Sequence, residues 1–276
     1  MKITVLSENT VADERLECEH SLSVLVQMQS AVILFDTGCG GMFIRNAQKL
    51  GLDLTRVTHV VLSHGHYDHA GGIPDFLTMN TTASVYMRKE ALSPVYSVRA
   101  AGETDYIGVS QELADSNRLV FSHDQMTIAP GVTLYSDFMR SEAIPETNRG
   151  LMRMERGQLI QDDFIHEQAA SLVQGGQSLL ITGCSHQGII NIMKDYHLKT
   201  GGFPDYVLGG FHLHSHTYGK AEDHIIRHTA DYLASTPSIY LTCHCTGQPS
   251  FDALKQLLGE QIQYISAGQT LTLPGK

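Results

Sequence analysis

The chain alternates between strand-like and helix-like patterns of apolar residues. Alternating or continuous apolar runs predict strands, and apolar positions three and four residues apart predict helices. Near the start of the chain, strands are predicted over 1–7, 22–28, 31–36 and 57–63, and a helix over 42–51. This order indicates a strand-rich first half whose later strands are joined through a helix.

A similar layout returns in the second half of the chain. Strands are predicted over 178–183, 205–212, 238–243 and 261–272, and helices over 188–196, 221–234 and 250–258. The recurrence of strand, helix and strand predicts a duplicated unit. We expect the polar strand ends of both copies to converge on one cleft.

Residues 88–170 show weaker periodicity and more polar positions than either half. Pro94, Pro130 and Pro145 interrupt long regular elements there, because proline lacks the backbone N–H. We therefore expect this segment to form surface structure and a loop that faces the substrate.

The composition is that of a folded domain with a large core. The chain has 276 residues, of which 42% are hydrophobic, and we expect a single domain over 1–276. The formal net charge of −10 excludes broad electrostatic binding to nucleic acid polymers or acidic membranes. The five cysteines lack paired spacing, and we see no secretory signal or membrane-spanning run. A cytoplasmic protein with reduced thiols is expected.

Four side chains able to bind a metal lie within six residues, directly behind the strand predicted over 57–63. They belong to the segment His64-Gly65-His66-Tyr67-Asp68-His69. Since side chains alternate along a strand, His64 and His66 point the same way and can hold one ion through imidazole nitrogens. Asp68 and His69 begin a new turn and can reach a second ion beside the first. Histidine is the commonest metal ligand, so this density favours a metal site over chance.

Two ions need roughly eight donor atoms, which is more than this cluster supplies. Three histidines at the ends of later strands are candidates for the missing ligands. In order of preference they are His186, His244 and His212. Each of them alone also fits an ordinary strand-end histidine, whereas the three together with the first cluster favour ligands.

Further residues near these strand ends are candidates for supporting roles. Cys184 can bridge the ions or bind the second one, since thiolate binds zinc well, and a small buried thiol is the equal alternative. Asp36 can accept a hydrogen bond from a ligand histidine, or it can cap a turn. Glu19-His20 can face the cleft or lie in a solvated turn, and we assign His20 to the turn. We expect His214 or His216 near the substrate.

The segment from His64 to His69 matches the His-x-His-x-Asp-His signature of the metallo-β-lactamase superfamily, which this chain resembles. Phe35-Asp36-Thr37-Gly38 supports the resemblance. Within the superfamily, the chain is similar to the branch named after the archaeal dihydropterin ribofuranosyl-aminobenzene phosphate synthase. The segments that carry this likeness are Glu19-His20-Ser21-Leu22-Ser23, Thr182-Gly183-Cys184-Ser185-His186, Gly209-Gly210-Phe211-His212-Leu213 and His244-Cys245-Thr246-Gly247.

The resemblance implies an α/β fold of the αββα sandwich type, in which two βα halves place a dinuclear metal site at one edge of the sheets. Hydrolases of the superfamily often supply a bridging aspartate after a strand that ends in glycine. In this chain Gly183 is followed by Cys184 instead. This departure bears on the occupancy and geometry of the second ion's site.

Together these features predict a metal-dependent hydrolase in which a metal-bound water attacks a small anionic substrate, a phosphodiester or another ester. The assigned ligands are His64, His66 and His186 for one ion and Asp68, His69 and His244 for the other. Asp68 is also predicted to orient the water. His212 is predicted to stabilise the leaving oxygen or to bind substrate.

Zinc is the expected metal, and manganese and iron are also compatible with mixed histidine and carboxylate ligands. The sequence does not determine the oligomeric state, and a homodimer is one of the possibilities. Two alternative functions remain. One is a pterin-linked synthase that joins an aminobenzoate to a ribose phosphate donor, and the other is a metal-binding sensor module without turnover. The complete cluster from His64 to His69 argues against the sensor.

Overall fold

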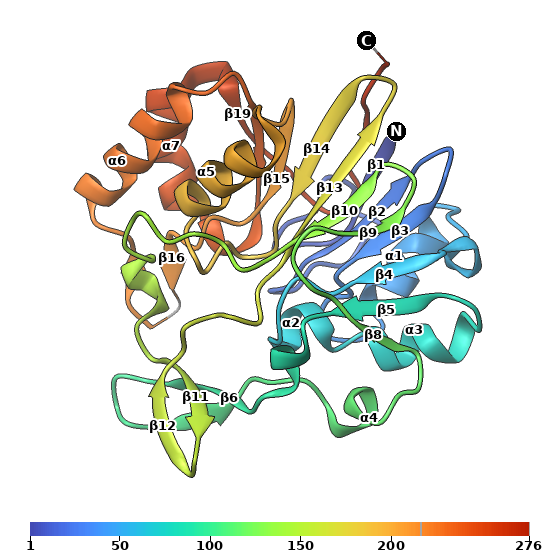
Figure 1. The fold of residues 1–276 in the computed structure, drawn as a ribbon, viewed down its shortest axis with the longest axis horizontal. Coiled ribbons are helices and arrows are strands. Elements are labelled where there is room, and N and C mark those ends of the chain that lie inside the picture. The colour runs from blue at the N-terminus through green and yellow to red at the C-terminus, as the bar shows by residue number, and fades with distance from the viewer. Residues whose placement is uncertain (216, 276) are drawn as a thin grey trace.

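Two seven-stranded β-sheets pack face to face in the computed structural model, which describes residues 1–215 and 217–275, and helices lie on the outer sides (Figure 1). The first sheet has the order β20, β1, β2, β3, β4, β5, β8, and the second β19, β18, β15, β14, β13, β10, β9. The first sheet contains β1 (Lys2–Ser7), β2 (Ser23–Gln27), β3 (Val32–Phe35), β4 (His59–Val61), β5 (Ser84–Met87), β8 (Leu119–Phe121) and β20 (Thr270–Thr272). The second contains β9 (Met126–Ala129), β10 (Val132–Tyr135), β13 (Ala169–Gln174), β14 (Gln177–Ile181), β15 (Tyr206–Gly209), β18 (Ile239–Thr242) and β19 (Ile262–Tyr264).

Each sheet combines antiparallel and parallel pairing. The parallel neighbours are β3, β4, β5 and β8 in the first sheet and β14, β15, β18 and β19 in the second. Parallel neighbours require crossover connections, which are usually helical. The carboxyl ends of several consecutive strands therefore lie at the same edge of each sheet.

The helices form two outer layers. Beside the first sheet lie α1 (Met42–Lys49), α2 (Tyr67–Ala70), α3 (Ile73–Met79) and α4 (Gln111–Ala114), and beside the second lie α5 (Ile189–Thr200), α6 (Asp223–Ala234) and α7 (Gln248–Leu258). Short 3₁₀ helices are η1 (Leu54–Arg56), η2 (Lys89–Leu92), η3 (Glu146–Asn148), η4 (His244–Thr246) and η5 (Gly259–Gln261). In the described ranges, none of the helices combines the length and apolar character needed to cross a bilayer.

Strand alternation divides the apolar side chains among three packed interfaces. Ile33 and Phe35 of β3 face the interior between the sheets, whereas Leu34 packs against the layer of α1 and α3. In β14, Ile181 faces the interior and Leu180 faces α5, α6 and α7. A strand with apolar side chains on both faces is stable only when both faces are buried, one against the other sheet and one against helices. This requirement is the physical reason for the four layers. The predicted αββα sandwich is confirmed.

The expectation of surface structure over 88–170 is wrong for part of that segment. β9 and β10 belong to the second sheet, and Val132 and Leu134 are fully buried. A separate four-stranded sheet, lower in Figure 1, is formed by β6 (Val95–Val98), β7 (Thr104–Tyr106), β11 (Leu151–Glu155) and β12 (Gln158–Gln161). Strands of three to five residues alternate too few times for the sequence pattern to reveal them.

Two other expectations need correction. The strand predicted over 261–272 is two strands in different sheets, since β19 pairs with β18 and β20 pairs with β1. The strand predicted over 57–63 covers only β4. A small two-stranded sheet of β16 (His214–Ser215) and β17 (Gly219–Lys220) follows β15.

Candidate metal centre

Strand ends of both sheets bring the candidate side chains together. β3 leads into Asp36, β4 into His64, β14 into Cys184 and His186, β15 into His212, and β18 into His244. The backbone turns sharply in these loops, with φ of 56° at Asp36, 57° at Ser185, 46° at His212 and 50° at His244. Residues other than glycine adopt this left-handed conformation rarely, and such strained residues cluster at functional sites.

The first histidine group consists of His64, His66 and His186, which are buried and whose ligand atoms lie within 4.8 Å of one another. Nε2 of His64 lies 3.0 Å from Nδ1 of His66 and 3.3 Å from Nε2 of His186. Within the described residues, Nε2 of His66 has no hydrogen-bond partner. The structure thus brings together the three residues assigned to one ion.

The acid–histidine group consists of Asp68, His69 and His244. Oδ2 of Asp68 lies 3.8 Å from Nε2 of His69 and 3.4 Å from Nε2 of His244. His20 joins this group, since its Nε2 lies 3.5 Å from Oδ2 of Asp68 and its ring stacks on His244. The assignment of His20 to a solvated turn is wrong, because the N–H of Leu22 donates to the carbonyl of Asp68 and holds this loop at the site.

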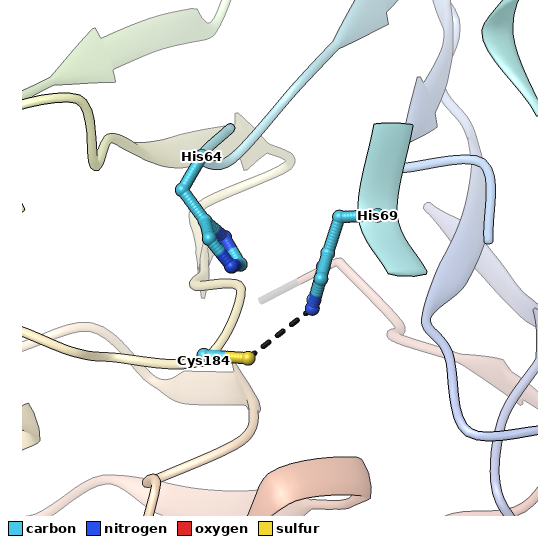
Figure 2. A group of neighbouring side chains, drawn as sticks. All are labelled: His64, His69 and Cys184. Atoms are coloured by element: carbon cyan, nitrogen blue, oxygen red, sulfur yellow. Dashed lines mark hydrogen bonds between the residues drawn. The ribbon is translucent and has the colours of Figure 1, made fainter. Parts of the chain in front are cut away.

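Cys184 lies between the two groups. Its Sγ is 3.2 Å from Nε2 of His69, and Figure 2 shows both directed toward a common space with His64. The same sulfur is also within 4.8 Å of ligand atoms of His186 and of His244. A thiolate at this position could contact ions on both sides.

Asp36 connects the loops after β3 and β4. Its carboxylate accepts hydrogen bonds from the backbone N–H of Ser63 at 2.7 Å, from Oγ of Ser63 at 2.7 Å and from Nδ1 of His69 at 2.6 Å. Oγ of Ser63 in turn accepts from Nδ1 of His64 at 2.8 Å. Because Nδ1 is engaged in both rings, His64 and His69 present Nε2 to the centre.

Burial sets the protonation of these histidines. Desolvation holds the pKa values of His64 and His186 well below the usual range and lowers the pKa of His66 to about 3. Neutral imidazole is the form that binds metals. Burial also disfavours charge on His69, but the carboxylates of Asp36 and Asp68 raise its pKa to about 9. The environment of His69 therefore favours a positive charge.

These residues fit a metal centre. Imidazole nitrogens face one another at 3.0 to 3.3 Å in both groups, with a carboxylate and a thiol beside them. Imidazole, carboxylate and thiolate are the usual ligands of zinc and related divalent ions. More candidate ligand atoms converge here than one ion requires.

His212 lies beside the first histidine group, with its ring centroid 4.3 Å from that of His186. The residue is only 8% exposed, and its ring also lies against the thiol of Cys245. Burial raises the pKa of that thiol, but hydrogen bonds with Cys184 and His212 hold it well below the usual range. His212 therefore lies beside both a candidate histidine and a cysteine of the centre.

A cavity of about 860 Å³ adjoins both groups and reaches the separate four-stranded sheet. Its lining includes Tyr67, Arg99, Tyr106 and His214. The β6–β7 connection therefore faces the cleft, as expected of a substrate-facing loop. His216, also expected near the substrate, lies outside the described residues.

Sequence reasoning missed four polar residues that contact two of the candidate histidines. They are Glu8 and Asn9 at His244, and Asn148 and Glu167 at His186. The polar pair directly after the first strand, Glu8-Asn9, was a readable signal of a strand end at the site. Asn148 ends the short 3₁₀ helix η3 and Glu167 lies in a turn before β13, and neither position has a periodic pattern that would predict it.

Comparison with known proteins decides the family. The sequence profile of the Metallo-beta-lactamase superfamily matches residues 16–238. The chain belongs to the metallo-β-lactamase superfamily. The resemblance carried by the segment from His64 to His69 is thereby confirmed.

Three similar proteins span almost the whole chain. An uncharacterised protein of Methanocaldococcus jannaschii is 31% identical over 261 residues, which cover 92% of this chain and 94% of that protein. The 7,8-dihydropterin-6-methyl-4-(β-D-ribofuranosyl)-aminobenzene-5′-phosphate synthase of the same organism is 24% identical over 273 residues, covering 92% and 90%. The crystal structure of Tm1679, a metal-dependent hydrolase of the β-lactamase superfamily, matches with a TM-score of 0.85 and 32% identity over 99% of each chain.

Proposed function

We propose that this protein is a metal-dependent hydrolase of a small anionic substrate, a phosphodiester or another ester. The observation that carries the proposal is the convergence of the first histidine group and the acid–histidine group beside one cavity. The similarity to Tm1679, described as a metal-dependent hydrolase, supports it at 32% identity.

Two divalent ions fit this arrangement. The first histidine group would hold one ion and the acid–histidine group the other, with Cys184 between them. When bound, such ions lower the pKa of a water molecule and polarise the phosphoryl or carbonyl group that it attacks. Zinc suits the combined imidazole, carboxylate and thiolate set best, while manganese and iron accept the imidazole and carboxylate part.

In this proposal Asp68 and His212 act on the reacting groups. Oδ2 of Asp68 faces the cluster beside Nε2 of His244 and would accept a hydrogen bond from the attacking water, which orients its lone pair. The ring of His212, which lines the cavity beside His186, would donate to the leaving oxygen as negative charge develops there. Hydrolysis then adds the hydroxyl of water to phosphorus or carbon and leaves a proton on the departing oxygen.

The cavity sets the size of the substrate. Its volume of about 860 Å³ lies within the range of small-molecule sites, roughly 300 to 1,000 Å³. Arg99 lies in the lining, where it pairs with Asp105 at 2.7 Å, and its guanidinium would also attract an anionic group. The net charge of −10 opposes binding of a long polynucleotide.

A pterin-linked synthase is the second candidate, and one observation favours it. The chain is 24% identical to a dihydropterin-linked synthase over 92% of its length. Tyr67 and Tyr106 line the cavity and are 47% and 52% exposed, so their rings are available for stacking on a flat heterocycle.

The test begins with protein purified without added metal. Elemental analysis identifies the bound ion, a chelator removes it, and the same ion is restored before a screen with bis(p-nitrophenyl) phosphate, p-nitrophenyl acetate and a reduced pterin. We expect the protein to hydrolyse one of the esters, and we expect this activity to be lost when the metal is removed and to return when the metal is restored.

Full metal content without turnover of any ester would overturn the proposal. In that case, stabilisation by the pterin in a thermal-shift assay would favour the synthase, and its absence the sensor.

A further inference from the structure

His186 and His244 follow different strands of the second sheet, yet each is held by the same three contacts. A glutamate accepts the backbone N–H of the histidine, and an asparagine contacts both its carbonyl oxygen and its ring. One histidine belongs to each group of the centre. Each group of the centre therefore contains one histidine that is fixed by a glutamate and an asparagine.

At His186 the glutamate and the asparagine come from the turn before β13 and from the end of η3. Oε1 of Glu167 accepts the backbone N–H at 2.7 Å. Nδ2 of Asn148 donates to the carbonyl oxygen of His186 at 2.8 Å, and Oδ1 of Asn148 lies 2.7 Å from Nδ1 of the ring. Glu167 and Asn148 are 1% and 2% exposed, so solvent does not compete for these contacts.

At His244 the glutamate and the asparagine are consecutive residues that follow β1. Oε1 of Glu8 accepts the backbone N–H at 2.7 Å. Nδ2 of Asn9 donates to the carbonyl oxygen of His244 at 3.3 Å, and Oδ1 of Asn9 lies 3.0 Å from Nδ1 of the ring. Thus residues from the first sheet hold a ligand loop of the second.

The double contact determines which ring nitrogen carries the proton. A carbonyl oxygen only accepts, so the amide must turn Nδ2 toward it, which leaves Oδ1 facing the ring. Oδ1 also only accepts, so Nδ1 of the histidine must carry the hydrogen. The lone pair is then on Nε2, and Nε2 is the atom of His186 and of His244 that faces the other histidines of the centre.

We propose that Asn148 and Asn9 are positioning residues that lock His186 and His244, respectively, as the Nδ1–H tautomer and so prepare Nε2 of each ring for one ion. This inference rests on the metal centre proposed above. Groups that orient a ligand histidine contribute roughly 10- to 100-fold to metal affinity. Loss of each asparagine should therefore weaken one ion selectively.

The decisive readout is the tautomer in metal-free protein. Long-range ¹H–¹⁵N spectra of protein labelled at histidine should show Nδ1–H rings for both histidines in the natural chain. Asn148→Leu keeps the branched shape of the side chain without its hydrogen bonds and should release His186 alone, and Asn9→Leu should release His244 alone. Asn148→Asp keeps an acceptor at the ring and should preserve the tautomer, which also serves if the leucine variant does not fold.

Zinc affinity, measured by competition with a chromophoric chelator, supplies the second readout. Each leucine variant should lose roughly 10- to 100-fold in affinity for one of the two ions. Asn80→Leu is the matched control, because Asn80 is a 1% exposed asparagine that holds the backbone of Val57 and Ala83 and no histidine. It should change neither readout.

Unchanged tautomers in both leucine variants, or equal changes at both histidines in each, would overturn the proposal. Failure of the proposed hydrolase function gives a different result from failure of the proposed roles of Asn148 and Asn9. A natural chain that binds zinc but hydrolyses nothing defeats the hydrolase while the tautomer spectra and the affinities still decide the roles of Asn148 and Asn9.

Discussion

Asp36 accepts a hydrogen bond from Nδ1 of His69 at 2.6 Å, and both side chains are completely buried. The same carboxylate accepts the backbone N–H of Ser63 next to His64, so it holds the loops of both candidate groups. Asp36→Asn keeps the shape and tolerates the left-handed backbone, but its amide can present a donor to Nδ1. We expect metal affinity to fall roughly 10- to 100-fold, measured by chelator competition.

The control for this variant is Asp137→Asn. Asp137 has a similar positive φ, 52°, but it is exposed and pairs with Arg88 away from the centre. Its replacement should leave metal affinity unchanged. Equal affinity in the two variants would mean that Asp36 does not support a ligand.

His66→Ala should remove metal and activity together. His66 supplies one of the three imidazoles of the first histidine group, so its loss leaves that ion with too few ligands. Elemental analysis and turnover of the ester found in the screen are the measurements. His224→Ala, at a histidine that is 71% exposed and pairs with Glu222, should change neither. Full metal content with unchanged turnover in His66→Ala would contradict the proposed centre.

Cys184 should decide how the second ion is held. Its sulfur lies 3.2 Å from Nε2 of His69, so Cys184→Ala should weaken one ion by roughly tenfold or more. In cobalt-substituted protein, the thiolate-to-metal absorption should disappear with this variant. Cys184→Asp should restore binding without the absorption, and Cys18→Ala, at an exposed thiol, should change nothing. If the absorption persists in Cys184→Ala, the thiolate that binds the metal would be that of Cys245, which lies in the same cluster.

Asn80→Leu should destabilise the fold without touching the centre. Nδ2 of Asn80 donates to the carbonyl of Val57 at 2.9 Å, and Oδ1 accepts the N–H of Ala83 at 2.8 Å. Removing both contacts leaves buried backbone groups unpaired, which costs about 2 to 4 kcal/mol of unfolding free energy. Denaturant unfolding of metal-free protein measures it, with the exposed Asn117→Leu as control. A loss below about 0.5 kcal/mol would contradict this account of Asn80.

The fold could be predicted where apolar periodicity is strong and resemblance supplies the layer order. Helices α1, α5, α6 and α7 lie where the spacing predicts them, because each packs one apolar face on a sheet. β9, β10 and β13 were not predicted, since short strands flanked by polar turns carry little pattern. The division of the last predicted strand between two sheets depends on partners distant in sequence, β18 and β1.

The sequence by itself determined the candidate chemistry of this protein. The dense run from His64 to His69 and the histidines at later strand ends supply the types of side chain that could bind a metal, because local spacing sets which side chains share a direction. Only the tertiary structure decided which of these side chains meet. It brought His20 to Asp68, placed Cys184 between the groups, and put Asn148 and Asn9 against His186 and His244. Those contacts join residues far apart in the chain, and they arise only when the two sheets pack face to face.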